Sequence, residues 1–162
     1  MAFFYIVFGI LTLYFLLLAW SALGFIFTPF FKAKEKNLQV PISIIICARN
    51  EEKNIDLCLN TLINQKYVLH KIQLIFINDA SSDNTVQRAE RILKKSGVNY
   101  KVISNPVQKG KKQSISYAMQ FVSNELIVVR DADTFTISSN YLQTVSDFYQ
   151  QNSSDLIIAP IV

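Results

Sequence analysis

Histidine and cysteine are scarce in this sequence, which has one histidine and two cysteines among 162 residues. A Ser/His/Asp relay would have to use His70, and the residues around it do not resemble a nucleophile elbow. We therefore expect a loop or surface histidine. Cys47 and Cys58 lack the spacing of a metal site, and we interpret both as buried thiols. The sequence thus gives no support to a serine hydrolase or to a zinc site held by cysteines.

Glycine-rich phosphate-binding motifs are missing as well. The chain has four glycines, and neither G-x-G-x-x-G after a strand nor G-x-x-x-x-G-K-[ST] occurs in it. The dinucleotide fingerprint and the phosphate-loop motif are therefore both excluded. A ligand that carries phosphate must be bound by another arrangement of residues.

Charged side chains are absent from Met1 to Phe31, and residues 3–27 form a nearly unbroken apolar run of 25 residues. A helix of that length reaches roughly 37 Å, more than the ~30 Å hydrocarbon core of a bilayer. We predict a transmembrane anchor over residues 1–31 and a juxtamembrane linker over residues 32–41. A cleaved signal peptide and a buried core helix are the alternatives, but the run lacks a basic n-region and is long for a signal peptide.

Three lysines follow this apolar run directly, at positions 32, 34 and 36. Since positive residues stay on the cytoplasmic side, we expect a single-pass protein of the cell membrane whose soluble domain is cytoplasmic. These lysines and Glu35 supply half of the net charge of +4. The rest of the chain is only mildly basic, and its positive charge is too small and too dispersed for nucleic-acid binding.

Apolar runs alternate with helical stripes after Pro41. We predict strands at 42–47, 72–77, 100–104 and 126–129, and helices beginning near 50, 86, 110 and 138, with a further apolar run at 156–162. For the first helix we expect Asn50 as the N-cap and Glu51 and Glu52 in the first turn. This alternation predicts one α/β domain over residues 42–162, a Rossmann-like, mostly parallel sheet with helices on both faces.

Acidic residues follow two of the predicted strands at their carboxyl ends, where open parallel sheets bind ligands. Asp131 and Asp133 form a D-x-D pattern, and their hard oxygen ligands suit Mg²⁺ or Mn²⁺. A purely structural alternative is a turn in which Asp133 caps a helix that starts near Ser138. Asp79 follows the strand at 72–77, and its carboxylate is placed to accept hydrogen bonds from a base or a ribose.

Most of these polar positions also have an explanation that requires no ligand. Asp79 can form an Asx turn before the next helix, with Ser82 or Asp83 as the N-cap. Glu51 would stabilise a first helical turn with or without a ligand. Lysines surround Gly110 at a predicted helix N-terminus, and we favour Lys111 as a phosphate ligand because Gly110 lets the backbone approach closely.

Four segments together resemble the family 2 glycosyltransferases: residues 41–52, 77–85, 110–112 and 131–133. The resemblance implies a GT-A fold that binds nucleotide-sugars, with a UDP- or GDP-linked sugar as the donor. It also implies inverting transfer to the hydroxyl of a lipid-linked or glycan acceptor at the cytoplasmic membrane face. By the same resemblance, Glu51 and Asp79 contact the nucleoside and Lys111 lies near the diphosphate. Asp131 lies near the ribose or phosphate, and Asp133, with Asp131, holds a divalent metal, Mg²⁺ or Mn²⁺.

The sequence departs from this family in places. The family often has Asp-Asp-Gly where this chain has Asn78-Asp79-Ala80, and often tyrosine at the position of Arg49, which leaves open which base is read. Family members also continue into a half that carries the acceptor site and the general base. We therefore expect the base beyond Val162 and a domain that is incomplete at its C-terminus.

Three other interpretations stay open. The chain can be a truncated, non-catalytic module that binds nucleotide-sugars. It can be a phosphotransferase of the haloacid dehalogenase type, although Phe135 stands where that signature has threonine or valine. Finally, Asp79 to Asp83 approximates the D-x-S-x-S pattern of a metal-dependent adhesion module.

Overall fold

The computed structural model describes residues 1–26 and 38–151. The chain divides into two compact units, Met1–Lys32 and Ala33–Val162, and each is described by itself. The lysines at 32, 34 and 36 and the apolar run at 156–162 lie outside the described residues. The orientation predicted from these lysines, and the extent of the predicted domain to residue 162, therefore stay predictions.

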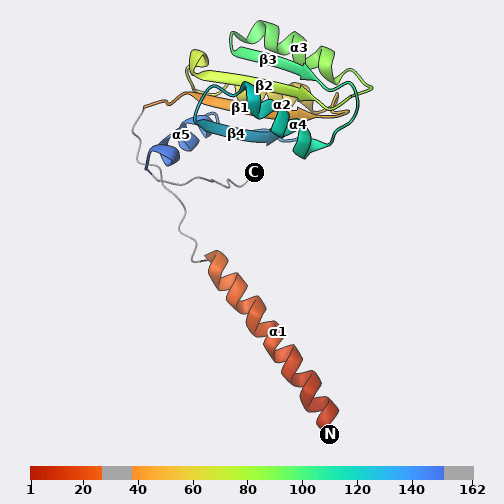
Figure 1. The fold of residues 1–162 in the computed structure, drawn as a ribbon. Coiled ribbons are helices and arrows are strands. Elements are labelled where there is room, and N and C mark those ends of the chain that lie inside the picture. Colours follow the sequence, from red (N-terminus) through yellow and green to blue (C-terminus); the bar gives the residue numbers. More distant parts are fainter. Residues whose placement is uncertain (27–37, 152–162) are drawn as a thin grey trace. The chain divides into compact units, whose positions relative to one another are not determined.

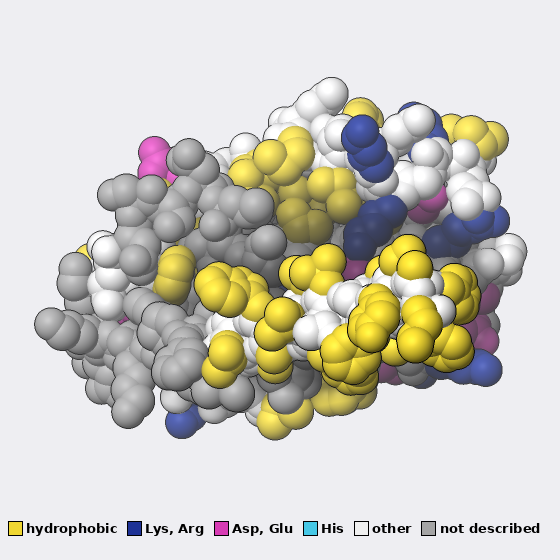
Figure 2. Space-filling model, turned by 90° about the horizontal axis from the view of Figure 1, so that it is seen from below, with side chains coloured by type: hydrophobic (Ala, Val, Ile, Leu, Met, Phe, Trp, Pro, Cys, Tyr) yellow, Lys and Arg dark blue, Asp and Glu magenta, His cyan; other side chains and the backbone are white. Residues whose placement is uncertain are grey.

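The first unit consists of the helix α1 (Ala2–Ile26), whose first and last turns contain no charged residue. The side of α1 visible in Figure 2 is covered with hydrophobic side chains. Over Ala2–Gly24 it is long and apolar enough to cross a membrane, and it is the one such helix among the described residues. A signal sequence meets the same criteria, so the anchor over residues 1–31 stays a prediction.

The second unit is built on a four-stranded sheet in the order β3-β2-β1-β4. Its strands are β1 (Ile42–Ala48), β2 (Ile72–Asn78), β3 (Asn99–Ser104) and β4 (Leu126–Asp131). All three neighbouring pairs are parallel, with Ile42 opposite both Ile72 and Leu126. The predicted parallel sheet is confirmed, and each predicted strand lies within an observed one.

Helices cover both faces of this sheet, as Figure 1 shows. They are α2 (Ile55–Ile63), α3 (Thr85–Ser96), α4 (Lys111–Ala118) and α5 (Tyr141–Gln151), with short 3₁₀ helices η1 (Leu69–Lys71) and η2 (Met119–Phe121). Side chains of α2, α3 and α5 pack with Ile44 and Phe76 on one face. Ala118 of α4 packs with Ile45 and Ile75 on the other. The central strands are buried on both sides, which is why their sequences are continuous apolar runs.

The start of α2 differs from the prediction. Asn50 is not an N-cap, because its φ of 54° places it in the left-handed region and α2 begins five residues later, at Ile55. The carbonyl of Glu51 accepts the N–H of Ile55 at 2.9 Å, so Glu51 and Glu52 belong to a turn that precedes the helix. Asp56 is the acidic residue of the first helical turn.

The other helices fit the predicted stripes more closely. α3 ends before Gly97, which caps it with a φ of 72°, and Gly110 precedes α4. α5 begins at Tyr141, three residues after the predicted start. His70 is exposed in η1, as expected for a surface histidine.

Candidate functional site

A pocket of about 300 Å³ opens at the carboxyl edge of the sheet. The chain passes from β1 outward to β2 and β3 and then returns to place β4 on the other side of β1. The loops after β1 and β4 therefore diverge at this point, which is where open α/β sheets bind ligands. The pocket is lined by Cys47, Ala48, Arg49, Glu51, Asp79, Gln108, Gly110, Lys111, Asp131, Ala132 and Asp133. The structure thus brings all five candidate residues of the sequence analysis into one pocket.

Asp79 is the most deeply placed of these acids, with 3% of its surface exposed. Its Oδ1 accepts hydrogen bonds from Asn105 Nδ2 at 2.9 Å, Lys109 N at 2.8 Å and Ser114 Oγ at 3.1 Å. Its Oδ2 accepts one from Gly110 N at 2.8 Å. Burial opposes ionisation of this carboxyl, but the four hydrogen bonds outweigh it and lower the pKa of Asp79. Asp79 is therefore a charged group that fixes the segment leading into α4.

Asp131 and Asp133 lie on a turn at the end of β4. The turn is closed by the N–H and hydroxyl of Thr134, which donate to the Asp131 carbonyl at 3.3 and 2.8 Å. Arg130, which is buried and lies near the ring of Tyr141, donates to the Thr134 hydroxyl at 3.1 Å. These contacts hold the backbone of the turn and leave both carboxylates available to the pocket.

The two carboxylates differ in their partners. Asp131 forms an ion pair with Lys111, and both side chains are about half exposed. Asp133 is exposed, and its carboxylate accepts no hydrogen bond from the residues that the structure describes. It does not cap α5, which starts at Tyr141, so the purely structural interpretation of Asp133 is not what the fold shows.

The lining of the pocket fits a divalent cation. Its charged side chains are four carboxylates, at Glu51, Asp79, Asp131 and Asp133, and two cations, at Arg49 and Lys111. Asp131 and Asp133 offer hard oxygen ligands, the kind that Mg²⁺ and Mn²⁺ prefer. Within the described ranges no three His, Cys, Asp or Glu side chains converge as a metal site. The pair would therefore leave most of a metal's coordination to water and a ligand.

Glu51 lies where the loop after β1 meets the loop after β2. Its backbone N–H donates to Thr85 Oγ1 at 2.8 Å, and its carboxylate accepts Asn54 Nδ2 at 2.7 Å. The neighbouring Glu52 N–H donates to Asp83 Oδ2 at 3.2 Å, and Asp83 Oδ1 accepts the N–H of Thr85 at 3.0 Å. Asp83 therefore has the local role at the start of α3 that the sequence allowed, although the N-cap position belongs to Asn84.

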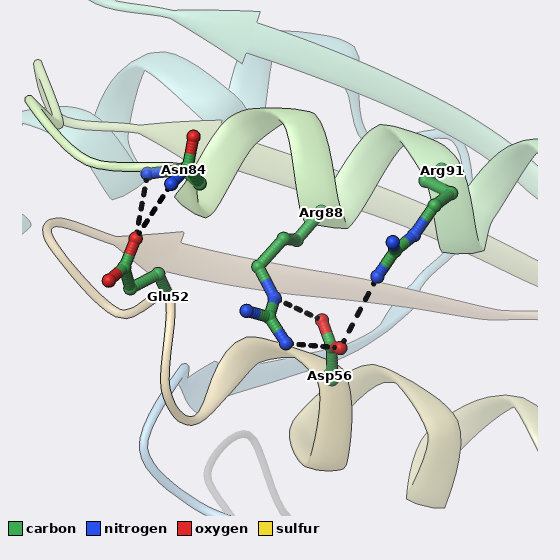
Figure 3. A network of polar contacts seen from close by, with 5 residues as sticks. All are labelled: Glu52, Asp56, Asn84, Arg88 and Arg91. Atoms are coloured by element: carbon green, nitrogen blue, oxygen red, sulfur yellow. Dashed lines mark hydrogen bonds and ion pairs between the residues drawn. The ribbon is translucent and has the colours of Figure 1, made fainter.

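Further contacts join the same two loops and the helices that follow them (Figure 3). The Glu52 carboxylate accepts the backbone and side-chain N–H groups of Asn84 at 3.1 and 3.2 Å. Arg88 binds both oxygens of Asp56, at 3.0 and 2.8 Å, and Arg91 approaches the same carboxylate. The Arg88 hydrogen bonds lower the pKa of Asp56. These links join α2 to α3 and hold the Glu51 side of the pocket in place.

The adhesion-type metal arrangement does not form. The Asp79 carboxylate is held by residues 105–114, whereas Asp83 is held by Glu52 and Thr85. Ser81, the serine at the third position of the D-x-S-x-S pattern, accepts the N–H of Asn50 with its Oγ at 3.1 Å. The three groups thus serve different partners.

Sequence reasoning missed several residues in and beneath the pocket. Asn105 and Ser114 were not candidates; they do not line the pocket, but both are buried against Asp79. Cys47 was interpreted as buried but is only half-buried, because it lies near the open end of β1 and lines the pocket. Burial raises the pKa of the Cys47 thiol. Cys58 is buried as predicted, and burial raises its pKa to about 11.

Comparison with known proteins reveals a common family. The profile of a family described as "Glycosyl transferase family 2" matches residues 43–162. An "Uncharacterized glycosyltransferase" of Haemophilus influenzae is 31% identical over 111 residues, which are 68% of this chain and 33% of that protein. The chain thus spans a third of the length of this relative.

Two solved structures show the same fold. The mannosyltransferase PcManGT from Pyrobaculum calidifontis, in complex with GDP-Man and Mn²⁺, superposes with a TM-score of 0.69 at 22% identity over 80% of this chain and 38% of that one. TarS from Staphylococcus aureus, residues 1–349 with UDP-GlcNAc, gives 0.63 at 23% identity over 70% and 32%. The predicted GT-A fold is thereby confirmed.

Proposed function

The chain belongs to glycosyl transferase family 2, and from this premise we propose that its pocket binds a nucleotide-diphosphate sugar together with a divalent metal ion. In this proposal the sugar is transferred with inversion to an acceptor hydroxyl at the cytoplasmic face of the cell membrane. The supporting observation is the pocket itself, in which side chains from four connections of a GT-A sheet meet at the switch point.

The charges of the pocket support the metal. Its four carboxylates outnumber its two cationic side chains, so a negatively charged diphosphate alone would be repelled. We assign Asp133 and Asp131 to the metal, because both carboxylates are accessible on one turn. A bound Mg²⁺ or Mn²⁺ supplies positive charge that offsets the charge developing on the departing diphosphate. The PcManGT complex contains Mn²⁺, which is consistent with this assignment.

Each of the remaining residues is assigned to one part of the nucleotide-sugar donor. Glu51, on the loop that is hydrogen-bonded to the loop after β2 and to the start of α3, faces the nucleoside end. Lys111, next to Gly110 at the start of α4, faces the diphosphate, and Asp131 lies between the metal and the ribose or phosphate. Asp79 belongs to the same donor site. PcManGT and TarS were solved with GDP-Man and UDP-GlcNAc respectively, so we expect a GDP- or UDP-linked sugar.

The acceptor is proposed from the apolar helix α1 and from the relatives. A membrane anchor would keep the pocket close to the bilayer, where lipid-linked or glycan acceptors are found. TarS is described as a poly(ribitol-phosphate) β-N-acetylglucosaminyltransferase, a name that gives a poly(ribitol-phosphate) polymer as what it acts on. We therefore propose a lipid-linked or growing glycan acceptor.

Calorimetry on the whole chain in detergent tests the donor site. We expect UDP-GlcNAc or GDP-Man to bind, and Mn²⁺ to raise its affinity about tenfold or more, since the cation offsets the repulsion between the pocket carboxylates and the diphosphate. Asp133→Ala should remove this increase. Glu90→Gln, which changes an exposed carboxylate of α3 outside the pocket, should retain it.

Three outcomes separate the alternatives. Failure of both donors to bind in the presence of Mn²⁺ would contradict the proposal. Binding without transfer to any acceptor would favour a non-catalytic nucleotide-sugar module. Phosphate release from a model ester, with phosphate trapped on Asp131, would favour the phosphotransferase.

A further inference from the structure

The positive charge of this chain is concentrated in one stretch, which its low net charge conceals. Residues 91–124 contain seven lysine and arginine side chains and no aspartate or glutamate, although the net charge of the whole chain is only +4. This stretch covers the end of α3, the edge strand β3 and the helices α4 and η2. One edge of the second unit is therefore basic, and the remainder of the chain is acidic on balance.

The side of α4 that is turned away from the sheet belongs to this basic edge. Ser114 and Ala118 are buried and Ile115 packs with the core, so the opposite side of the helix is left to solvent. The exposed residues on that side are Lys112, Gln113, Ser116 and Tyr117, and Met119 follows in η2. Tyr117 is 39% and Met119 44% exposed. Large apolar groups thus lie among charged ones.

Contacts between cations and aromatic rings join this side of α4 to its neighbours. Lys101 of β3 places its Nζ 3.6 Å from the centre of the Phe121 ring. The Phe121 and Tyr117 rings meet edge to face with their centres 5.4 Å apart, and Lys109 Nζ lies 5.6 Å from the centre of the Tyr117 ring. We call this region the α4 surface; it consists of Lys101, Lys109, Lys112, Tyr117, Met119 and Phe121.

The opposite face of the sheet carries a different pattern of charge. There Asp56 of α2 pairs with Arg88 and Arg91 of α3, and Glu90 is exposed between the two arginines. Cations and acids are mixed on that face, as on an ordinary solvated surface. The three lysines of the α4 surface form no ion pair with any residue that the structure describes. Their charge is therefore available to an anionic partner.

We propose that the α4 surface docks on the anionic headgroups of a phospholipid bilayer. The negative potential of such a bilayer attracts lysines, and the apolar side chains among them can enter the boundary between headgroups and acyl chains. A dissolved polyanion would use the lysines but would leave Tyr117 and Met119 without a partner. The helix α1, which is long and apolar enough to cross a membrane, would keep the domain at a bilayer. No residue of the α4 surface lines the donor pocket, so this inference does not depend on the proposed donor site.

The reactivity of individual lysines tests this contact. The whole chain would be placed in nanodiscs of phosphatidylcholine alone or with about 30% phosphatidylglycerol, and labelling by an amine-reactive reagent would be followed by mass spectrometry. We expect labelling of Lys101, Lys109 and Lys112 to be about fivefold slower or more in the anionic discs. Lys53 and Lys66, which are exposed at the two ends of α2, are internal controls and should change by less than about twofold.

Charge variants ask whether the lysines carry the contact. In Lys101→Gln with Lys112→Gln, labelling of Lys109 in anionic discs should return to within about twofold of its rate in neutral discs, since each lysine near such a bilayer changes docking roughly fivefold. The matched control is Lys53→Gln with Lys66→Gln, which changes the net charge by the same amount on the other face. It should leave the slow labelling of Lys109 unchanged.

A further variant tests the apolar part of the contact. Tyr117→Ser keeps every charge and should still reduce the slowing at Lys112 from about fivefold to about twofold, because binding to a bilayer also depends on buried apolar area. In the unsubstituted chain the slowing should disappear at about 1 M salt, where charges are screened beyond ~3 Å.

Three results would overturn the inference. The first is equal labelling rates in the two kinds of disc at the lysines of the α4 surface. The second is equal slowing at Lys53 and Lys66, which would indicate a general effect of the anionic lipid on the reagent. The third is slowing that appears only when soluble polyphosphate is added and is unaffected by Tyr117→Ser, which would favour a dissolved polyanion as the partner.

Discussion

Replacing Gly110 by alanine should destabilise the second unit by about 2 kcal/mol and weaken diphosphate binding. Gly110 has a φ of 86° and a ψ of 156°. That conformation is essentially confined to glycine, and it costs other residues about 1–3 kcal/mol. A Cβ added at Gly110 would meet no atom within 4 Å, so the cost arises from the backbone and not from a clash. The strain can be relieved by a shift of the turn that carries Lys111, at the expense of its bonds to Asp79.

Gly97→Ala provides the matched comparison. Gly97 caps α3 with a φ of 72° and a ψ of 2°, and its added Cβ would meet Leu69 Cδ1 at an ordinary 3.7 Å. A left-handed alanine costs about 1–2 kcal/mol, so both variants should lose stability. Gly110 lines the pocket, whereas Gly97 does not. We therefore expect weaker UDP or GDP binding in Gly110→Ala alone.

Circular dichroism and calorimetry on the whole chain would measure the two effects. A loss of about 2 kcal/mol corresponds to a fall of roughly 8 °C in the Tm of a domain of this size. An unchanged Tm in Gly110→Ala would refute the assigned strain. Equal loss of diphosphate affinity in both glycine variants would refute the role of the turn.

Three further results are expected. Lys111→Met should change stability by less than about 1 kcal/mol, because its ion pair with Asp131 is solvent-exposed. The same variant should reduce the salt dependence of UDP or GDP binding. An unchanged salt slope would contradict a contact between Lys111 and phosphate. Ala80→Gly should raise the free energy of unfolding by about 1 kcal/mol, because Ala80 has a φ of 57°, and a lower urea midpoint would contradict this. The lowered pKa of Asp79 means that its contribution to stability is complete above the ordinary aspartate pKa of about 3.9 and is lost as the pH falls through the lower folded-state value. The parent should therefore lose stability more steeply than Asp79→Asn below that pH, and parallel acid-unfolding curves would disprove it.

The strands could be predicted from the sequence, and so could the convergence of the five candidate residues in one pocket. Both follow from the burial and the direction of the strands. β1 and β2 are covered on both faces, so nearly all of their residues are apolar and their limits are visible as changes in polarity. The carboxyl ends of parallel strands meet at one edge, so polar residues that follow separate strands converge. Asp79 and Asp131 are far apart in the chain but lie at the carboxyl ends of strands on either side of β1.

The beginning of α2 could not be predicted in this way. Asn50 and Glu51 have the chemistry of a helix start, but side-chain chemistry does not fix φ. The left-handed conformation of Asn50 lets its Oδ1 accept the N–H of Ser82 at 2.9 Å, a contact with a loop 32 residues away. Asn50 therefore serves a tertiary contact and not the start of the helix, which begins after Asn54.

The partners of Asp79 were hidden for a similar reason. Asn105 and Ser114 are 26 and 35 residues further along the chain, and neither forms a motif of its own. Their signal is the order of the strands, since the end of β3 must lie beside the end of β2 for Asn105 to reach Asp79. Asn105 N donates to the Asn78 carbonyl at 2.9 Å and continues that parallel pairing by one residue.

The pocket has two sides that are held differently, and this difference bears on the order of binding. On the Glu51 side, the loops after β1 and β2 are joined by hydrogen bonds through Asn50, Glu52 and Asp83. On the opposite side, where we propose that a metal binds, the Asp131–Asp133 turn is closed by its own Thr134 and by Arg130, and its carboxylates line the pocket. Preorganised groups bind at a lower entropic cost than groups that must be ordered. We therefore expect the nucleoside to be received by a preformed surface, and the Asp131 and Asp133 side chains to reach their final positions only when metal and diphosphate bind together.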